Sequence, residues 1–207
     1  MIDNADLWYC SIHNYGIDVN PPVVVPDWLL RRFDALYAMP PHYEASYYGP
    51  VNMLLTTFFP VTMRFLVKPQ ARIREPPILG GRTSEDSYGQ TVGTSDKDGN
   101  PDFLVSTGTA TLSADVSFLI YEVKLGEEDE TESQVQMERY MQWARQYQRQ
   151  VAAWAPAEVF AVLVLGAQSQ IYELHADGIF TNTEPRHGTT SETIQNLLQA
   201  LRTARGS

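Results

Sequence analysis

The sequence predicts an α/β protein in which a mixed central β-sheet is flanked by helices. Strand-like apolar runs alternate along the chain with segments whose apolar residues recur at helical spacing. The run at 118–125 is apolar except for two charged residues, which is the pattern of a central strand covered on both faces. Chains that alternate strands and amphipathic helices in this way pack the helices against the faces of a sheet.

The first half of the chain is predicted to be helical and then extended. A helix begins at Asp27, a residue type favoured at helix N-caps, and a proline pair ends it. A second helix covers about 43–59, and Pro50 either divides it or is its first helical residue. One or two strands follow in 61–74. The segment 76–100, rich in glycine, proline and small polar residues, is expected to form a loop.

The second half of the chain contains the predicted centre of the sheet. Thr131 and Gln134 have the spacing of a capping box, and Gly166 separates the last two predicted strands. The predicted elements are strands at 102–105 and 118–125, a helix at 131–150, strands at 159–165 and 171–174, and a C-terminal helix at 189–204.

The composition predicts a single domain, 1–207, because 43% of the residues are hydrophobic and only 19% are charged. Residues 1–25 show no clear period and are expected to form an arm. No stretch is long and apolar enough to span a membrane, and the beginning lacks the pattern of a secretory signal. Cys10 is the only cysteine, which excludes an intrachain disulfide. We therefore expect an intracellular protein, in the cytoplasm or nucleus, without a membrane partner.

The charge balance bears on nucleic-acid binding. A formal net charge of −10 disfavours broad affinity for phosphate backbones, which lysine and arginine normally contact. Much of the acid is concentrated in 127–132, and Arg139, Arg145 and Arg149 follow in the next predicted helix. Local positive potential is therefore compatible with an acidic chain.

A pair of charges inside the apolar run at 118–125 identifies the candidate site. Glu122 and Lys124 are two residues apart on one strand, so their side chains point to the same face. Asp102 opens the preceding predicted strand. Two carboxylates can bind a hard cation through oxygen, and a lysine can stabilise the negative charge that grows on a phosphate in the transition state. A Glu-x-Lys pair alone is usually a charge pair of little energetic value, and the apolar context is what favours a site.

These residues resemble the signature of a known nuclease group. Pro101-Asp102 followed by Glu122-Val123-Lys124 is similar to the PD-(D/E)XK nuclease superfamily, as is the order of helix, strand, Asp strand, Glu-x-Lys strand, helix and further strand. Gln136 and Tyr140 in the next helix resemble the Gln-x-x-x-Tyr pair of its exonuclease and recombination-nuclease branch. The resemblance covers roughly 43–175 and implies a restriction-endonuclease-like core.

The resemblance implies an enzyme, a Mg²⁺-dependent nuclease that hydrolyses phosphodiester bonds of DNA or RNA, with Mn²⁺ able to replace Mg²⁺. A homodimer is compatible with it, because many nucleases of this type dimerise to cut two strands. The segment 48–70 also resembles small uncharacterised fungal proteins, which bring no established activity. The implied metal ligands are Asp102, Glu122 and the carbonyl of Val123, and the other implied catalytic residues are Lys124, Gln136 and Tyr140.

Alternatives stay open for both the residues and the function. Glu44 is a further candidate acid in the helix predicted at 43–59. Asp115, which is nearer to Glu122 in the sequence than Asp102 is, competes as the metal ligand or is a plain turn residue. The functional alternative is a catalytically inactive nuclease-like module that binds protein or nucleic acid. Converging carboxylates favour activity, whereas a Lys124–Glu122 salt bridge with Asp102 facing elsewhere favours the module.

Overall fold

The computed structural model of the protein describes residues 21–71, 73–74, 83–85, 91–93, 98–109, 115–125, 130–151, 158–183 and 185–206. The helices in these ranges are α2 (Asp27–Ala38), α3 (Ala45–Phe58), the 3₁₀ helix η1 (Val61–Met63), α4 (Glu130–Val151) and α5 (Glu192–Arg205). The strands are β1 (Phe65–Pro69), β2 (Ile73–Arg74), β3 (Thr83–Glu85), β4 (Thr91–Gly93), β5 (Asp98–Gly99), β6 (Phe103–Thr107), β7 (Val116–Lys124), β8 (Val159–Leu165), β9 (Gln168–Leu174), β10 (Phe180–Asn182) and β11 (His187–Gly188).

The main sheet is mixed and seven-stranded, with the order β1-β6-β7-β8-β9-β10 and with β11 paired to β9. All neighbouring strands in it are antiparallel except β7 and β8, which are parallel. A parallel pair needs a crossover connection, and α4 lies between these two strands in the chain. The prediction of an α/β fold with a mixed, helix-flanked sheet is therefore confirmed.

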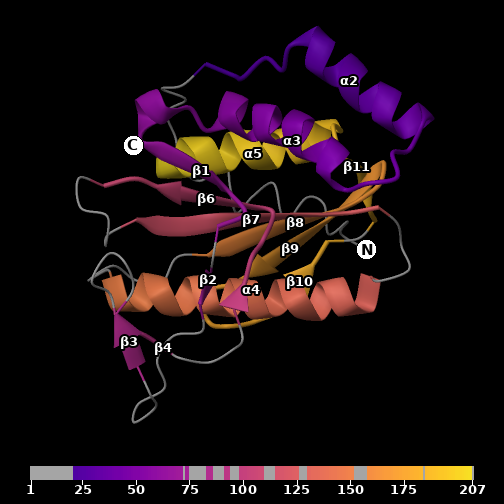
Figure 1. Cartoon of the computed structure of the whole chain (residues 1–207). Helices are drawn as coiled ribbons and strands as arrows, with labels where there is room; N and C mark the ends of the chain where they lie inside the picture. The colour runs from indigo at the N-terminus through magenta and orange to yellow at the C-terminus, as the bar shows by residue number, and fades with distance from the viewer. Residues whose placement is uncertain are drawn as a thin grey trace, which may run out of the picture.

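The helices form layers on both faces of the sheet. Helices α2, α3 and α5 lie on one face and α4 lies on the other (Figure 1). Side chains of β7 alternate between the two faces: Tyr121 and Val123 belong to the core under α3 and α5, whereas Ile120 packs with Met137 of α4. The same alternation directs Glu122 and Lys124 toward the α4 face.

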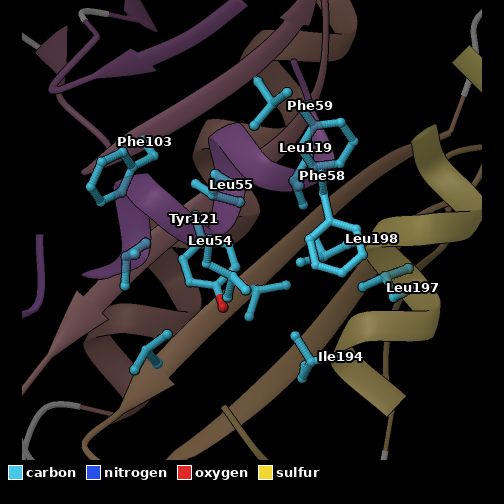
Figure 2. Close-up of a cluster of buried hydrophobic side chains, with 14 of the residues drawn as sticks. Leu54, Leu55, Phe58, Phe59, Phe103, Leu119, Tyr121, Ile194, Leu197 and Leu198 are labelled. Carbon is cyan, nitrogen blue, oxygen red and sulfur yellow. The ribbon is translucent and has the colours of Figure 1, made fainter. Parts of the chain in front are cut away.

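The larger core lies between the sheet and the pair α3 and α5. Figure 2 shows Leu54 and Phe58 of α3 pointing toward Tyr121 of β7 and Leu198 of α5. These four side chains are at most 1% exposed. Burial of this apolar surface supplies the main driving force that holds the helices on the sheet. The same packing fixes the position of α3, and therefore of its residue Tyr48, relative to the adjacent ends of β6 and β7.

The helix predictions hold in their extent and differ at their starts. Pro50 lies inside α3, which is continuous, so the proline neither divides nor begins this helix. Asp27 is in the first turn of α2 and Pro26 is the cap, so the N-cap prediction was wrong by one residue. Helix α4 already includes Glu130, which places Thr131 inside the helix and makes the capping-box prediction wrong. The C-terminal helix is confirmed as α5, capped by the Ser191 side chain.

The strands predicted in 61–74, 102–105, 118–125, 159–165 and 171–174 are confirmed in the main sheet, whereas β10 and β11 were not predicted. Gly166 has a φ of 62°, a conformation that favours glycine, at the turn between β8 and β9. The segment 76–100 was predicted as a loop, but it contains the short strands β3, β4 and β5. Residues 21–25 of the predicted arm contain no helix or strand, and residues 1–20, with Cys10, lie outside the described ranges. Within the described part of the chain, no helix is long and apolar enough to cross a bilayer.

Candidate functional site

The beginning of β6 and the end of β7 lie side by side and bring two acidic residues together. The antiparallel register pairs Phe103 with Tyr121, so Asp102, which precedes β6, reaches the level of Glu122. The backbone N–H of Asp102 donates to Oε2 of Glu122 at 3.2 Å. Both residues are buried, at 7% and 3% exposure. The predicted pair of acids is therefore adjacent in space.

The carboxylate of Asp102 is held by two donors. Its Oδ2 accepts a hydrogen bond from the backbone N–H of Val123 at 2.8 Å, and its Oδ1 accepts one from the Tyr48 hydroxyl of α3 at 2.5 Å. Burial raises the pKa of Tyr48, and the negative charges of Asp102, Glu44 and Glu122 raise it further. Tyr48 therefore remains a protonated donor at neutral pH, and it directs the Asp102 carboxylate toward α3.

Glu122 and Lys124 form an ion pair on the α4 face of β7. The Lys124 Nζ lies 3.0 Å from Oε1 of Glu122, and 22% of the lysine side chain is exposed against 4% of the glutamate side chain. Burial raises the pKa of Glu122, as does the nearby charge of Asp102, while Lys124 acts in the opposite direction. Burial disfavours the charged form of Lys124, but the carboxylates of Glu122, Glu44 and Asp102 outweigh it and raise the lysine pKa.

These contacts form one continuous network, which we call the β6–β7 network and define as Asp102, Glu122, Lys124 and Tyr48. Each of its four carboxylate oxygens accepts a hydrogen bond or an ion pair. A carboxylate oxygen has two acceptor sites, so one hydrogen bond or ion pair does not use its full acceptor capacity. The network contains two carboxylates and one cationic side chain. Its residual negative charge is the electrostatic condition that favours a bound cation.

Gln136 and Tyr140 contact each other on α4, the helix that covers this face of β7. The Gln136 Nε2 donates to the Tyr140 hydroxyl at 2.5 Å, and Tyr140 is 2% exposed and packs beside Trp143. An added Cβ on Gly99 would lie 2.0 Å from the Tyr140 ring, so β5 packs directly on this side chain. Within the described part of the chain, neither residue is hydrogen-bonded to the β6–β7 network.

The two additional candidate acids have different positions. Glu44 precedes α3 and contributes to the electrostatic potential at both Tyr48 and Lys124, which places it near the β6–β7 network. Asp115 lies at the opposite end of β7, roughly 23 Å from Glu122 along an extended strand. There it forms an ion pair with Lys68 at 2.8 Å and accepts the N–H of Thr109 at 3.2 Å. The structure does not bring Asp115 to Glu122.

Sequence reasoning missed two features that the fold reveals. Tyr48 gave no signal as a partner of Asp102, because the two residues are far apart in the chain. A second acidic cluster joins Glu158, Glu173 and His175, whose ligand atoms lie within 4.8 Å of one another. The spacing of Glu173 and His175 on an alternating strand could have indicated that these two share a face.

Comparisons with known proteins leave the site to be judged on its own geometry. Neither a protein-family model nor a curated protein matches this chain.

Proposed function

We propose that the protein is a metal-dependent nuclease that hydrolyses phosphodiester bonds of nucleic acid, with its site at Asp102, Glu122 and Lys124. The observation that carries the proposal is the burial of both carboxylates beside a single lysine. Buried carboxylates are costly unless cations or hydrogen bonds compensate them. One lysine leaves the pair with a net negative charge, which a divalent cation would compensate.

The order of the elements supports a restriction-endonuclease-like core. Helix α3, strands β1, β6 and β7, helix α4 and strand β8 follow one another as the resemblance to the PD-(D/E)XK superfamily implies, apart from the short elements between β1 and β6. Asp102 directly precedes β6 and Glu122 lies near the end of β7, which agrees with the strands that the resemblance implies. Helix α4 connects β7 to its parallel neighbour β8 and carries Gln136 and Tyr140.

The donor set fits Mg²⁺ or Mn²⁺, because both ions prefer oxygen ligands. Asp102 and Glu122 would hold the cation through the acceptor sites that their hydrogen bonds leave open, together with the carbonyl of Val123. When bound, the cation supplies a Lewis acid and lowers the pKa of a water that can attack phosphorus.

The side chains of the protein supply orientation and charge. The Tyr48 hydroxyl and the Val123 amide fix both oxygens of Asp102, so its carboxylate is oriented before any ligand arrives. Lys124 keeps its proton, since neighbouring carboxylates raise its pKa, and its side chain is partly exposed. Its charge would stabilise the negative charge that develops on the phosphate oxygens. Gln136 and Tyr140 would support this arrangement from α4.

A cleavage assay tests the proposal. We expect wild-type protein with Mg²⁺ or Mn²⁺ to cleave at least one of single- or double-stranded DNA and RNA. Lys124→Ala should lower the rate by about 100-fold or more, the effect of removing a group that stabilises transition-state charge. Lys68→Ala is the matched control, because Lys68 is also a strand lysine paired to an aspartate. Absence of wild-type cleavage, or equal rates in both variants, would contradict the proposal.

A second candidate function, an inactive nuclease-like module that binds protein or nucleic acid, is favoured by a different observation. Lys124 is engaged with Glu122, and both oxygens of Asp102 are engaged with Tyr48 and Val123. If this network remains closed, the fold serves as a binding surface only. The module predicts that nucleic acid, if it binds, is retained intact in a gel-shift experiment with Mn²⁺ present throughout.

A further inference from the structure

The opposite end of the sheet carries the second cluster of ionisable side chains. Glu158 directly precedes β8, and the parallel register of β7 and β8 pairs Lys124 with Leu165. Seven residues of extended chain separate Leu165 from Glu158, or roughly 23 Å. The cluster of Glu158, Glu173 and His175 is therefore separate from the β6–β7 network, and its properties do not depend on the proposed nuclease site.

The strand register places these side chains on one face. Phe160 pairs with Glu173 across β8 and β9, and Glu173 pairs with Thr181 across β9 and β10. Glu158 is two residues before Phe160 and His175 is two residues after Glu173, so alternation gives all of them the same direction. This is the face that α5 covers, and Arg205 at the end of α5 donates to the Glu158 backbone carbonyl at 3.2 Å.

The imidazole of His175 is oriented from outside the cluster. Its Nε2 lies 3.1 Å from the Thr181 hydroxyl, and its Nδ1 lies 3.0 Å from Oε1 of Glu173. Histidines that bind metals characteristically donate their other ring N–H to a protein acceptor, which fixes the ring and the tautomer. When Nε2 donates to Thr181, the Nδ1 lone pair faces Oε1 of Glu173, and a proton or a cation between these two atoms would satisfy both.

The charge balance of the cluster leaves a buried carboxylate poorly compensated. Glu173 is 8% exposed, and the neutral form of His175 supplies no positive charge. Burial raises the pKa of Glu173 to about 7, while His175 lowers it and Glu158 makes a smaller contribution that raises it. The two glutamates and the imidazole form a nitrogen and oxygen ligand set, and the Arg205 guanidinium approaches it at the Glu158 carbonyl.

We infer that Glu158, Glu173 and His175 form a binding site for a transition-metal ion of the Zn²⁺ type. Zn²⁺ binds both carboxylate oxygens and imidazole nitrogens, and catalytic zinc sites use three protein ligands with a fourth position left to water or another ligand. The nitrogen ligand favours Zn²⁺ over Mg²⁺ and Ca²⁺, which prefer oxygen alone. The ligand atoms lie within 4.8 Å of one another, and tetrahedral bonds of about 2.1 Å require them to approach to about 3.4 Å.

Calorimetric titration of Zn²⁺ into the whole protein tests the inference. We expect wild type to bind one equivalent that His175→Ala loses or binds at least tenfold more weakly. Glu173→Gln should weaken the same equivalent, because it removes the buried ligand charge. Asp102→Asn/Glu122→Gln should retain it, which separates this site from the proposed nuclease site whether or not the protein cleaves nucleic acid.

The controls make a negative result decisive. His187→Ala removes a histidine outside the cluster, on β11, and should bind Zn²⁺ as wild type does. Circular dichroism confirms that each variant is folded. If wild type binds no Zn²⁺, or if folded His175→Ala and folded Glu173→Gln both bind it as wild type does, the cluster is an ion pair between Glu173 and His175 and the inference is wrong.

Discussion

The two ends of the central sheet bury acidic residues in different ways. At the β6–β7 end, every oxygen of Asp102 and Glu122 accepts a hydrogen bond or an ion pair from a backbone amide, a tyrosine or a lysine. At the β8–β9 end, the buried Glu173 is paired with His175, which is cationic only when protonated. The first end is electrostatically organised without a ligand, whereas the second depends on pH or on a cation.

The difference shows how a fold can prepare two kinds of charged site. Donors fixed by the backbone and by α3 orient the Asp102 carboxylate, which suits a reaction that requires positioned groups. The Glu173 and His175 pair contains few donors, so its stability depends on protonation, as its raised pKa indicates. Variants that remove a donor, an acceptor or a titrating group therefore affect the two ends differently.

The largest stability effect is expected for Asp102→Ala. This change removes the acceptor for the buried Val123 N–H and for the Tyr48 hydroxyl. A buried group without a partner costs about 1–3 kcal/mol, so we expect a loss of about 2–4 kcal/mol in urea-induced unfolding. Asp115→Ala is the control, because its ion pair with the half-exposed Lys68 is worth about 1 kcal/mol or less. Equal losses in the two variants would remove the distinction between an organised network and an ordinary ion pair.

A pH-dependent effect is expected at the other end of the sheet. The pKa of Glu173 in the metal-free folded protein is about 7, above its ordinary 4.5. The folded state therefore favours the protonated form of the Glu173 carboxyl. This stabilisation of the folded protein is complete at pH values below the ordinary pKa of 4.5, and it is lost as the pH rises to about 7. The loss is at most about 3 kcal/mol, since each pKa unit corresponds to about 1.4 kcal/mol. His175 and Glu158 are the ionisable groups that modulate it.

Glu173→Gln should remove that part of the pH dependence. Unfolding free energies measured from pH 4.5 to 7 with a chelator present should fall more steeply for wild type than for the variant. Glu138→Gln, an exposed change on α4, should follow the wild-type slope. Parallel curves for wild type and Glu173→Gln would show that the carboxyl is not perturbed by burial.

The smallest effect is expected for Tyr48→Phe. The variant keeps the ring against Phe103 and removes only the hydroxyl that donates to Asp102. Loss of a hydrogen bond to a charged acceptor should cost about 1.5 kcal/mol in thermal unfolding. Tyr43→Phe, at a residue that is 77% exposed, should change stability by less than about 0.5 kcal/mol. A neutral Tyr48→Phe would mean that α3 does not hold the Asp102 carboxylate.

The sequence predicted the parts of the fold and of the site that depend on local pattern. Strand alternation placed Glu122 and Lys124 on one face of β7, and their ion pair agrees with that placement. The apolar runs predicted the main strands, and helical spacing predicted α2, α4 and α5. These features depend on residues close together in the chain, so a single sequence contains them.

The rest depends on contacts between distant segments. Tyr48 meets Asp102 across 54 residues, and no local pattern encodes the packing of α3 that brings them together. Glu158 and Glu173 meet because of the register between β8 and β9, which periodicity alone does not specify. Asp115 is closer to Glu122 in the sequence than Asp102 is, which made it a competing candidate ligand. In the structure, the length of β7 separates Asp115 from Glu122.

Mn²⁺ titration by calorimetry decides whether the β6–β7 end binds the metal ion of the proposed nuclease. The titration compares wild type with Asp102→Asn/Glu122→Gln and with Asp115→Asn/Glu138→Gln, a control that removes the same charge elsewhere. We predict that the first double variant loses one equivalent of Mn²⁺ and that the control keeps it. Equal Mn²⁺ binding by all three proteins would contradict the claim and favour the inactive binding module.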